Sequence, residues 1–99
     1  MKSGFSIRWT DHALSERNKT FEYLEENFTQ RELRSLSVEI EKVVKLIAQN
    51  PYLFPVSDIN DVRKAVVLRF NSLYYRVQND SIEVLSFFSN RQNPKSRKL

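Results

Sequence analysis

The chain has 99 residues, of which 40% are apolar and 28% charged, with 16 Lys and Arg against 12 Asp and Glu and no cysteine. This composition is typical of a single globular domain over 1–99, and it excludes disulfide scaffolds, cysteine-ligated zinc modules and disordered chains. No apolar run approaches the roughly 20 residues that span a bilayer, and no apolar leader follows Lys2, so we expect a cytoplasmic protein that does not contact membranes.

A short strand and a long helix are expected at the start of the chain. Phe5, Ile7 and Trp9 alternate with polar residues, which predicts a strand over 5–9 with these three side chains on one face. Thr10 then offers an N-cap oxygen, and Asp11 lies in the first helical turn, where a negative charge is favoured. At helical spacing, one face of this helix carries Ala13, Arg17, Phe21, Leu24 and Phe28.

A second helix follows after about two residues. Thr29 and Glu32 form a capping box, and Pro51 disfavours a helical conformation at Asn50, where we expect the helix to end. Its apolar positions, again three and four residues apart, are Leu33, Leu36, Ile40, Val43 and Ile47. Two helices with so short a connection form an antiparallel helical hairpin.

Three strands are predicted after a connector that begins at Pro51. Alternation with period two extends over 62–70, and segments 73–77 and 82–88 are rich in β-branched and aromatic residues. Asn79 and Asp80 suit a two-residue turn with positive φ at both positions. That turn places the following residues opposite one another: Val77 and Ile82, Arg76 and Glu83, Tyr75 and Val84, and Tyr74 and Leu85.

The predicted register divides these last two strands into a core face and an open face. The core face, which receives the helices, carries Leu73, Tyr75, Val77, Ile82, Val84 and Phe88. The open face carries Tyr74, Arg76, Glu83, Leu85 and Phe87, and it is too apolar for a purely solvated surface. The element order predicts an α+β fold with an N-terminal strand, an antiparallel helical hairpin and a three-stranded antiparallel meander, with the helices packed on one face of the sheet.

Residues 90–99 form the last segment, which we expect to be a basic, frayed tail. This segment carries four Lys or Arg and no acid. Residues 1–50 hold eight basic and eight acidic side chains, whereas residues 51–99 hold eight and four, so the whole net charge of +4 lies in the second half. A basic half favours an acidic partner, either a nucleic acid or an acidic protein segment.

The sequence offers few groups for chemistry. His12 is the one histidine, Gly4 is the one glycine, and no metal-binding or phosphate-loop motif occurs, so we expect no metal and no cofactor. Four arginines lie on or beside the predicted sheet: Arg63, Arg69, Arg76 and Arg91. Guanidinium groups gathered on one surface could bind phosphates or an acidic peptide, or they could be solvated edge positions. Arg76 already has Glu83 as a partner across the strands.

Several short motifs resemble the RelE/ParE superfamily of type II toxins in their order and spacing, and the resemblance covers nearly the whole chain. In this sequence they read Ile7-Arg8-Trp9-Thr10-Asp11-His12-Ala13, Ile47-Ala48-Gln49-Asn50-Pro51, Phe54-Pro55, Val62-Arg63-Lys64, Tyr74-Tyr75-Arg76-Val77, Ile82-Glu83-Val84-Leu85 and Arg91-Gln92-Asn93-Pro94. The fold of that superfamily agrees with the element order predicted above.

The resemblance implies two kinds of activity. RelE-like members are ribosome-dependent mRNA endonucleases, and Arg63 and Arg91 match basic positions of their catalytic set. Ala65 and Ser72 occupy positions where further basic residues would be expected, and no tyrosine follows Arg91, so half of the expected charge stabilisation is missing. The ParE-like branch is closer, and its members poison DNA gyrase, cause growth arrest, serve in plasmid stabilisation and are neutralised by a cognate antitoxin.

The resemblance therefore favours a ParE-like toxin that binds DNA gyrase and is not an enzyme. The alternatives are a RelE-like mRNA interferase acting on the ribosome, and a degenerate member that binds antitoxin without being toxic. The antitoxin is expected to pack over the helical hairpin and the sheet. The residues expected to contact target or antitoxin are Arg63, Lys64, Arg69, Tyr74, Arg76, Leu85, Phe87, Arg91, Lys95, Arg97 and Lys98.

Overall fold

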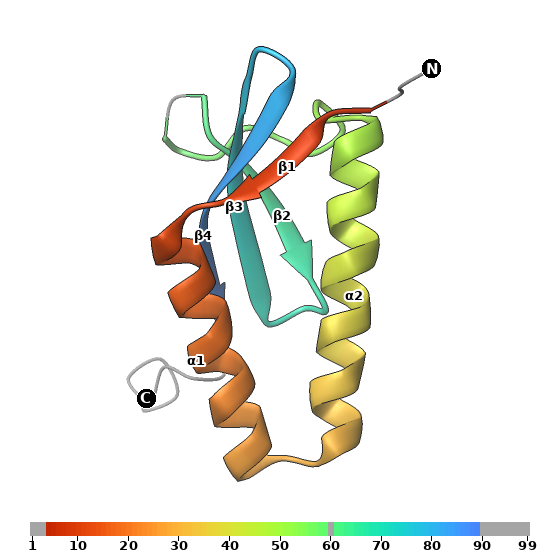
Figure 1. Ribbon diagram of the computed structural model, residues 1–99, viewed down its shortest axis with the longest axis vertical. Coiled ribbons are helices and arrows are strands. Elements are labelled where there is room, and N and C mark those ends of the chain that lie inside the picture. Colours follow the sequence, from red (N-terminus) through yellow and green to blue (C-terminus); the bar gives the residue numbers. More distant parts are fainter. Residues whose placement is uncertain (1–3, 60, 90–99) are drawn as a thin grey trace.

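A computed structural model describes residues 4–59 and 61–89 of the chain. The elements are β1 (Ser6–Trp9), α1 (Asp11–Asn27), α2 (Gln30–Gln49), β2 (Arg63–Val67), β3 (Asn71–Gln78) and β4 (Ser81–Ser89). Figure 1 shows the two helices meeting at a short loop at one end of the molecule and spreading apart toward the sheet. The predicted α+β fold, with a helical hairpin on one face of the sheet, is confirmed.

The predicted helix boundaries are confirmed by their caps. The Thr10 side chain accepts a hydrogen bond from the Ala13 amide at 3.1 Å, and Thr29 accepts one from the Glu32 amide at 3.3 Å. Asn50 caps the end of α2, as expected before proline. Phe28 was expected on the buried face of α1, but its backbone is extended because the helix ends at Asn27, and its side chain is 40% exposed.

The sheet has the strand order β1-β4-β3-β2, so the first strand of the chain pairs with the last. The β2-β3-β4 meander is antiparallel as predicted, whereas β1 lies parallel to β4, which makes the sheet mixed. A parallel pair needs a long crossover connection, and here the helical hairpin and the first two strands of the meander provide it. In Figure 1, β1 crosses in front of the meander before the chain enters α1.

The predicted register between β3 and β4 holds near the turn and fails beyond it. The pairs Val77 with Ile82, Arg76 with Glu83 and Tyr75 with Val84 are confirmed. Tyr74, however, lies opposite Ser86, because a β-bulge adds Leu85 to β4. The bulge reverses the two phenylalanines: Phe87 is 1% exposed in the core, whereas Phe88 is 42% exposed on the open face. The prediction that Phe87 lies on the open face and Phe88 in the core is wrong.

Both turns of the meander differ in detail from the sequence prediction. The two-residue turn at Asn79 and Asp80 is present, but Asn79 alone has a positive φ, of 56°. The first strand of the meander ends at Val67, earlier than expected, because Leu68 and Arg69 have φ values of 49° and 67°. These left-handed conformations turn the chain into β3, and Arg69 therefore lies in a turn and not on the sheet.

The core lies between the sheet and the two helices. Its central buried residues are Leu24, Leu36, Ile40, Val43, Ile47, Ala65, Val67, Leu73, Tyr75, Ile82, Val84 and Phe87. No helix within 4–59 and 61–89 has the length and apolar character needed to cross a membrane.

Candidate partner-binding face

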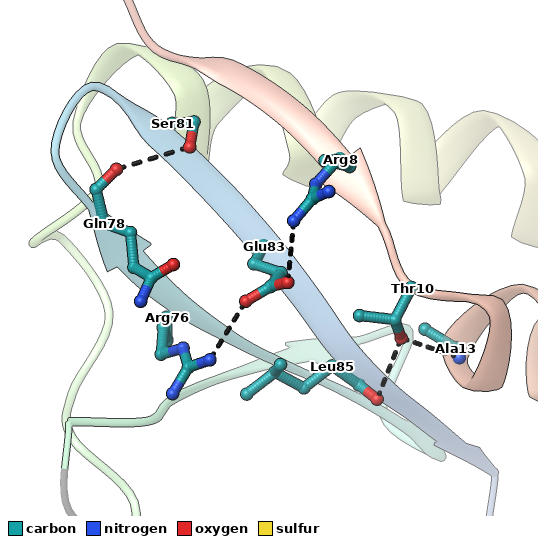
Figure 2. Close-up of polar contacts among 8 residues, drawn as sticks. All are labelled: Arg8, Thr10, Ala13, Arg76, Gln78, Ser81, Glu83 and Leu85. Carbon is teal, nitrogen blue, oxygen red and sulfur yellow. Dashed lines mark hydrogen bonds and ion pairs between the residues drawn. The ribbon is translucent and has the colours of Figure 1, made fainter.

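The open face of the sheet carries a charged row across three strands. The pairing register places Glu83 of β4 between Arg8 of β1 and Arg76 of β3. Arg8 Nη2 donates to Glu83 Oε2 at 2.9 Å, and Arg76 Nη2 donates to Oε1 of the same carboxylate at 3.1 Å (Figure 2). Since two guanidinium groups share one carboxylate, this row has an excess of positive charge.

Arg76 retains binding capacity despite its ion pair. Its side chain is 42% exposed, so part of its guanidinium group stays open to solvent, although its Nε is buried. Because the Glu83 carboxylate is only 16% exposed, the two arginines, and not the acid, present their charge to solvent. The row can therefore receive an anionic group.

A second row combines one charge with an aromatic ring. Lys64 of β2 and Tyr74 of β3 are register partners, and Lys64 Nζ lies 5.9 Å from the centre of the Tyr74 ring. Both residues line a hollow of about 210 Å³ together with Ser57, Asp58 and Ile59 of the connector. The sequence prediction that Tyr74 lies on the open face agrees with this position.

A third row is apolar. Val66, Ser72 and Phe88 are successive register partners on β2, β3 and β4. Val66 is 55% exposed and Phe88 is 42% exposed, with the small Ser72 between them. The open face thus changes along the strands from arginines to exposed apolar groups, a pattern that suits an amphipathic protein segment.

Arg63 is engaged within the fold and not presented on this face. Its Nη1 donates to the Phe54 carbonyl at 2.6 Å, and its guanidinium lies 5.0 Å from the centre of the Tyr52 ring. Both contacts belong to the connector that precedes β2. The group proposed for phosphate chemistry in an RNA-cleaving site therefore anchors a loop.

Tyr75 lies beside Arg63 on the neighbouring strand and completes this anchor. Its hydroxyl donates to the Pro51 carbonyl at 2.7 Å, and its side chain is fully buried. Burial raises the pKa of Tyr75 above its ordinary value, although the Arg63 charge and the Phe54 backbone partly offset this effect. A phenol held in its neutral form as a hydrogen-bond donor is suited to a structural role.

Among the residues that the structure describes, the remaining ionisable groups gather no metal or acid-base site. Ala65, which replaces an expected basic residue, is fully buried, and within the described ranges no three His, Cys, Asp or Glu side chains gather as metal ligands. His12 Nε2 lies 3.3 Å from Glu16 Oε2, and the other oxygen of Glu16 accepts from the Ser86 hydroxyl and the Phe87 amide, each at 2.8 Å. Glu16 thereby covers the edge of β4 beyond β1.

The other predicted contact residues are scattered. Arg69 lies in the β2-β3 turn with its guanidinium 5.8 Å from the centre of the Phe70 ring, and Leu85 is half-buried at the bulge. Phe87 is in the core and unavailable to a partner. Arg91, Lys95, Arg97 and Lys98 lie outside the described residues.

Sequence reasoning missed Arg8, Val66 and Phe88 as members of the open face. The alternation over 5–9 could have indicated Arg8, because it places Arg8 opposite the apolar face, but the partner of that strand was unknown. Arg17, which shares a helix face with apolar residues, is half-buried, with its guanidinium 4.8 Å from the centre of the Trp9 ring and 5.6 Å from that of Phe21.

Comparisons with known proteins agree with this fold. Residues 7–94 match the family model described as the ParE toxin of the type II toxin-antitoxin system, parDE. Among solved structures, the chromosomal ParDE system of P. aeruginosa contains a chain with a TM-score of 0.73 and 19% identity, covering 86% of this chain and 95% of that one. No match was found among curated proteins.

Two further solved structures share the fold at lower similarity. A chain of the RelBE2 toxin-antitoxin complex of Mycobacterium tuberculosis has a TM-score of 0.63 and 14% identity, with coverage of 90% of this chain and 94% of that one. A chain of the E. coli DinJ-YafQ complex has a TM-score of 0.59 and 9% identity, with coverage of 91% and 97%. These identities establish a shared fold and nothing finer.

Proposed function

The chain belongs to the ParE toxin family of type II toxin-antitoxin systems, and from that premise we propose that it arrests growth by binding DNA gyrase in the cytoplasm. A cognate antitoxin neutralises it, in line with the toxin-antitoxin complexes among the solved structures of the same fold. The toxin acts by occupying a protein surface, and no bond of RNA is cleaved.

The position of Arg63 is the observation that carries this proposal. Cleavage of RNA requires cationic groups free to stabilise the charge that develops on the phosphate. Arg63 instead donates to the Phe54 carbonyl and stacks on Tyr52, and Ala65 and Ser72 supply no charge. The arrangement therefore supports a binding role over a nuclease role.

The composition of the open face supports a protein target. Its exposed apolar row and its arginine row lie on one continuous sheet surface, whereas a surface for nucleic acid would be dominated by basic side chains that contact phosphates. Arg91, Lys95, Arg97 and Lys98 follow β4 in sequence and add positive charge to this half of the chain.

A supercoiling assay with purified gyrase and relaxed plasmid tests the proposal. The protein is expected to abolish supercoiling or to trap cleaved DNA, and the Val66→Ser/Phe88→Ser variant is expected to lose this effect. The Val38→Ser/Leu46→Ser variant is the matched control, because these two side chains are similarly exposed but lie on α2, which packs on the opposite face of the sheet. Full gyrase activity at excess protein would contradict the proposed target.

Growth and RNA assays separate the alternatives. Induction of the toxin is expected to arrest growth while mRNA on translating ribosomes stays intact. Cleavage of that mRNA, lost in the Arg63→Ala variant, would identify an interferase. Normal growth in the presence of folded protein would identify a member that retains only antitoxin binding.

A further inference from the structure

The end of β4 is a run of residues whose types are compatible with two pairing registers. Residues 86–89 read Ser-Phe-Phe-Ser, which is the same in both directions. Regular alternation would place Phe87 on the open face and Phe88 in the core, whereas the β-bulge at Leu85 places them the other way round. A shift by one residue therefore exchanges one phenylalanine for the other at the open-face position opposite Ser72.

The two registers turn different backbone amides toward the free edge of β4. β1 ends at Trp9, opposite Val84, and the Val84 carbonyl points toward that edge, because it accepts from the Thr10 amide at 3.0 Å. Successive residues of a strand direct their amides to opposite edges, so regular alternation would turn the Phe87 amide toward β3. The bulge turns this amide toward the free edge instead.

Glu16 of α1 binds the groups that the bulged register presents at this edge. Its Oε1 accepts from the Ser86 hydroxyl and from the Phe87 amide, each at 2.8 Å. The Thr10 hydroxyl adds a longer contact, donating to the Leu85 carbonyl at 3.4 Å (Figure 2). Hydrogen bonds to a carboxylate are stronger than those between neutral groups. Glu16 therefore stabilises the bulged register, and it would lose its amide donor in the regular one.

The core keeps a phenylalanine in either register. In the bulged register Phe87 lies opposite Leu73 and is 1% exposed. In the regular register Phe88 would enter the core opposite Asn71, and Ser86 would lie opposite Leu73. Apolar burial thus favours the bulge, whereas a continuous ladder between β3 and β4 favours its removal. Because these effects oppose each other, a contact specific to one register can decide between the two.

We propose that Glu16 is a positioning residue, which selects the register at the end of β4 and thereby the side chains that the open face presents. With Glu16 bound, the open face carries Ser86 and Phe88. Without it, Leu85 and Phe87 would occupy these two positions. A carboxylate on the helical side of the sheet thus sets the composition of the opposite face. The effect of this selection on gyrase binding rests on the proposed function, whereas the selection itself does not.

Cross-strand nuclear Overhauser effects measure the register directly. The parent and Glu16→Gln are expected to show Ser72 beside Phe88, because the amide oxygen of glutamine can still accept both hydrogen bonds. Glu16→Ala is expected to replace this contact by one between Ser72 and Phe87. Glu22→Ala is the matched control, since Glu22 is an exposed glutamate later in the same helix, and it should keep the parent contact. An unchanged register in Glu16→Ala would overturn the inference.

Deletion of Leu85 keeps the test decisive if Glu16→Ala alone does not fold. Without Leu85, plain alternation from Val84 gives residues 86–88 the same partners on β3 that the bulge gives them in the parent. Glu16→Ala combined with this deletion is therefore expected to fold and to keep the parent contact. If the deletion restores neither the fold nor that contact, Glu16 acts in some way other than by selecting the register, and the inference fails.

The supercoiling assay separates this inference from the proposed function. Glu16→Ala is expected to require roughly tenfold more protein than the parent for half-inhibition of gyrase, while Glu16→Gln and Glu22→Ala stay close to the parent. A parent that does not inhibit gyrase, together with the expected change of register, defeats the proposed function alone. Gyrase inhibition by the parent, together with an unchanged register in Glu16→Ala, defeats the inference alone.

Discussion

Arg63 and Tyr75 use their polar groups to hold the connector in place, so these groups are not free to act on a substrate. They are register partners on β2 and β3, and their polar ends donate to the carbonyls of Phe54 and Pro51. Backbone amides satisfy some carbonyls of the connector, such as that of Ile59, and these two side chains of the sheet satisfy those of Phe54 and Pro51. Sequence patterns indicated neither contact, because a backbone carbonyl as acceptor leaves no signature in the residue types.

The raised pKa of Tyr75 predicts how stability depends on alkaline pH. An unfolded tyrosine loses its proton near pH 10, whereas the buried one retains it to higher pH. Between these two pKa values the folded state binds more protons than the unfolded state, so its stability falls as pH rises. The stabilisation due to this hydroxyl is thus fully present below about pH 10 and is lost above it.

The Tyr75→Phe variant isolates this effect. At neutral pH it should unfold about 1 kcal/mol more easily than the parent, because one buried hydrogen bond is lost. That difference should shrink as pH rises above 10, as measured by urea titration at several pH values. Tyr52→Phe is the control, since Tyr52 is 61% exposed, and its difference from the parent should not vary in this way.

At the scale of elements, local signals predicted the helices well and the strands only in part. Caps and apolar spacing are properties of neighbouring residues, and they placed both ends of α2 correctly. The bulge at Leu85 depends on contacts from elsewhere: Thr10 and Glu16 bind backbone groups of β4 between Val84 and Phe87. Alternation along the sequence cannot reveal a residue inserted for such contacts, and this residue reversed the predicted faces of β4 beyond Leu85.

The positions of two valines on α2 predict that the same substitution changes the stability of the fold by very different amounts. Val43 is 5% exposed against the sheet side, whereas Val38 is 51% exposed. Val43→Asp should destabilise the fold by roughly 3 kcal/mol or more, because it buries an unpaired charge. Val38→Asp should change stability by less than about 1 kcal/mol. Thermal unfolding followed by circular dichroism measures both, and equal losses would contradict the assigned face of α2.

At the scale of the whole molecule, the sequence predicted the class of fold but not the pairing of the first strand with the last described strand. The pairing of β1 with β4 joins residues about 75 positions apart, as the ion pair between Arg8 and Glu83 illustrates. No local pattern encodes such a partner. The candidate face was therefore predicted only for β2, β3 and β4, and the arginine contributed by β1 was missed.

This long-range closure predicts the order of folding events. Contacts between distant segments carry a large loop-closure cost, so β1 should dock after the meander and helices have formed. Ile7→Ala should then mainly accelerate unfolding and leave the folding rate nearly unchanged. Val43→Ala should slow folding as well, because α2 packs early. Stopped-flow folding in urea measures both rates, and slower folding of Ile7→Ala would contradict this order.

Because β1 pairs with β4, the open face can form only after β4 has been synthesised. Of the strands in residues 4–59 and 61–89, β4 is made last, yet it is the one that pairs with β1, and it contributes the central carboxylate of the arginine row. A nascent chain that still lacks β4 cannot assemble the open face, even if its helices have already folded. Synthesis of the helices and of the first two meander strands alone therefore yields neither the paired edge of β1 nor the charged row that β4 completes.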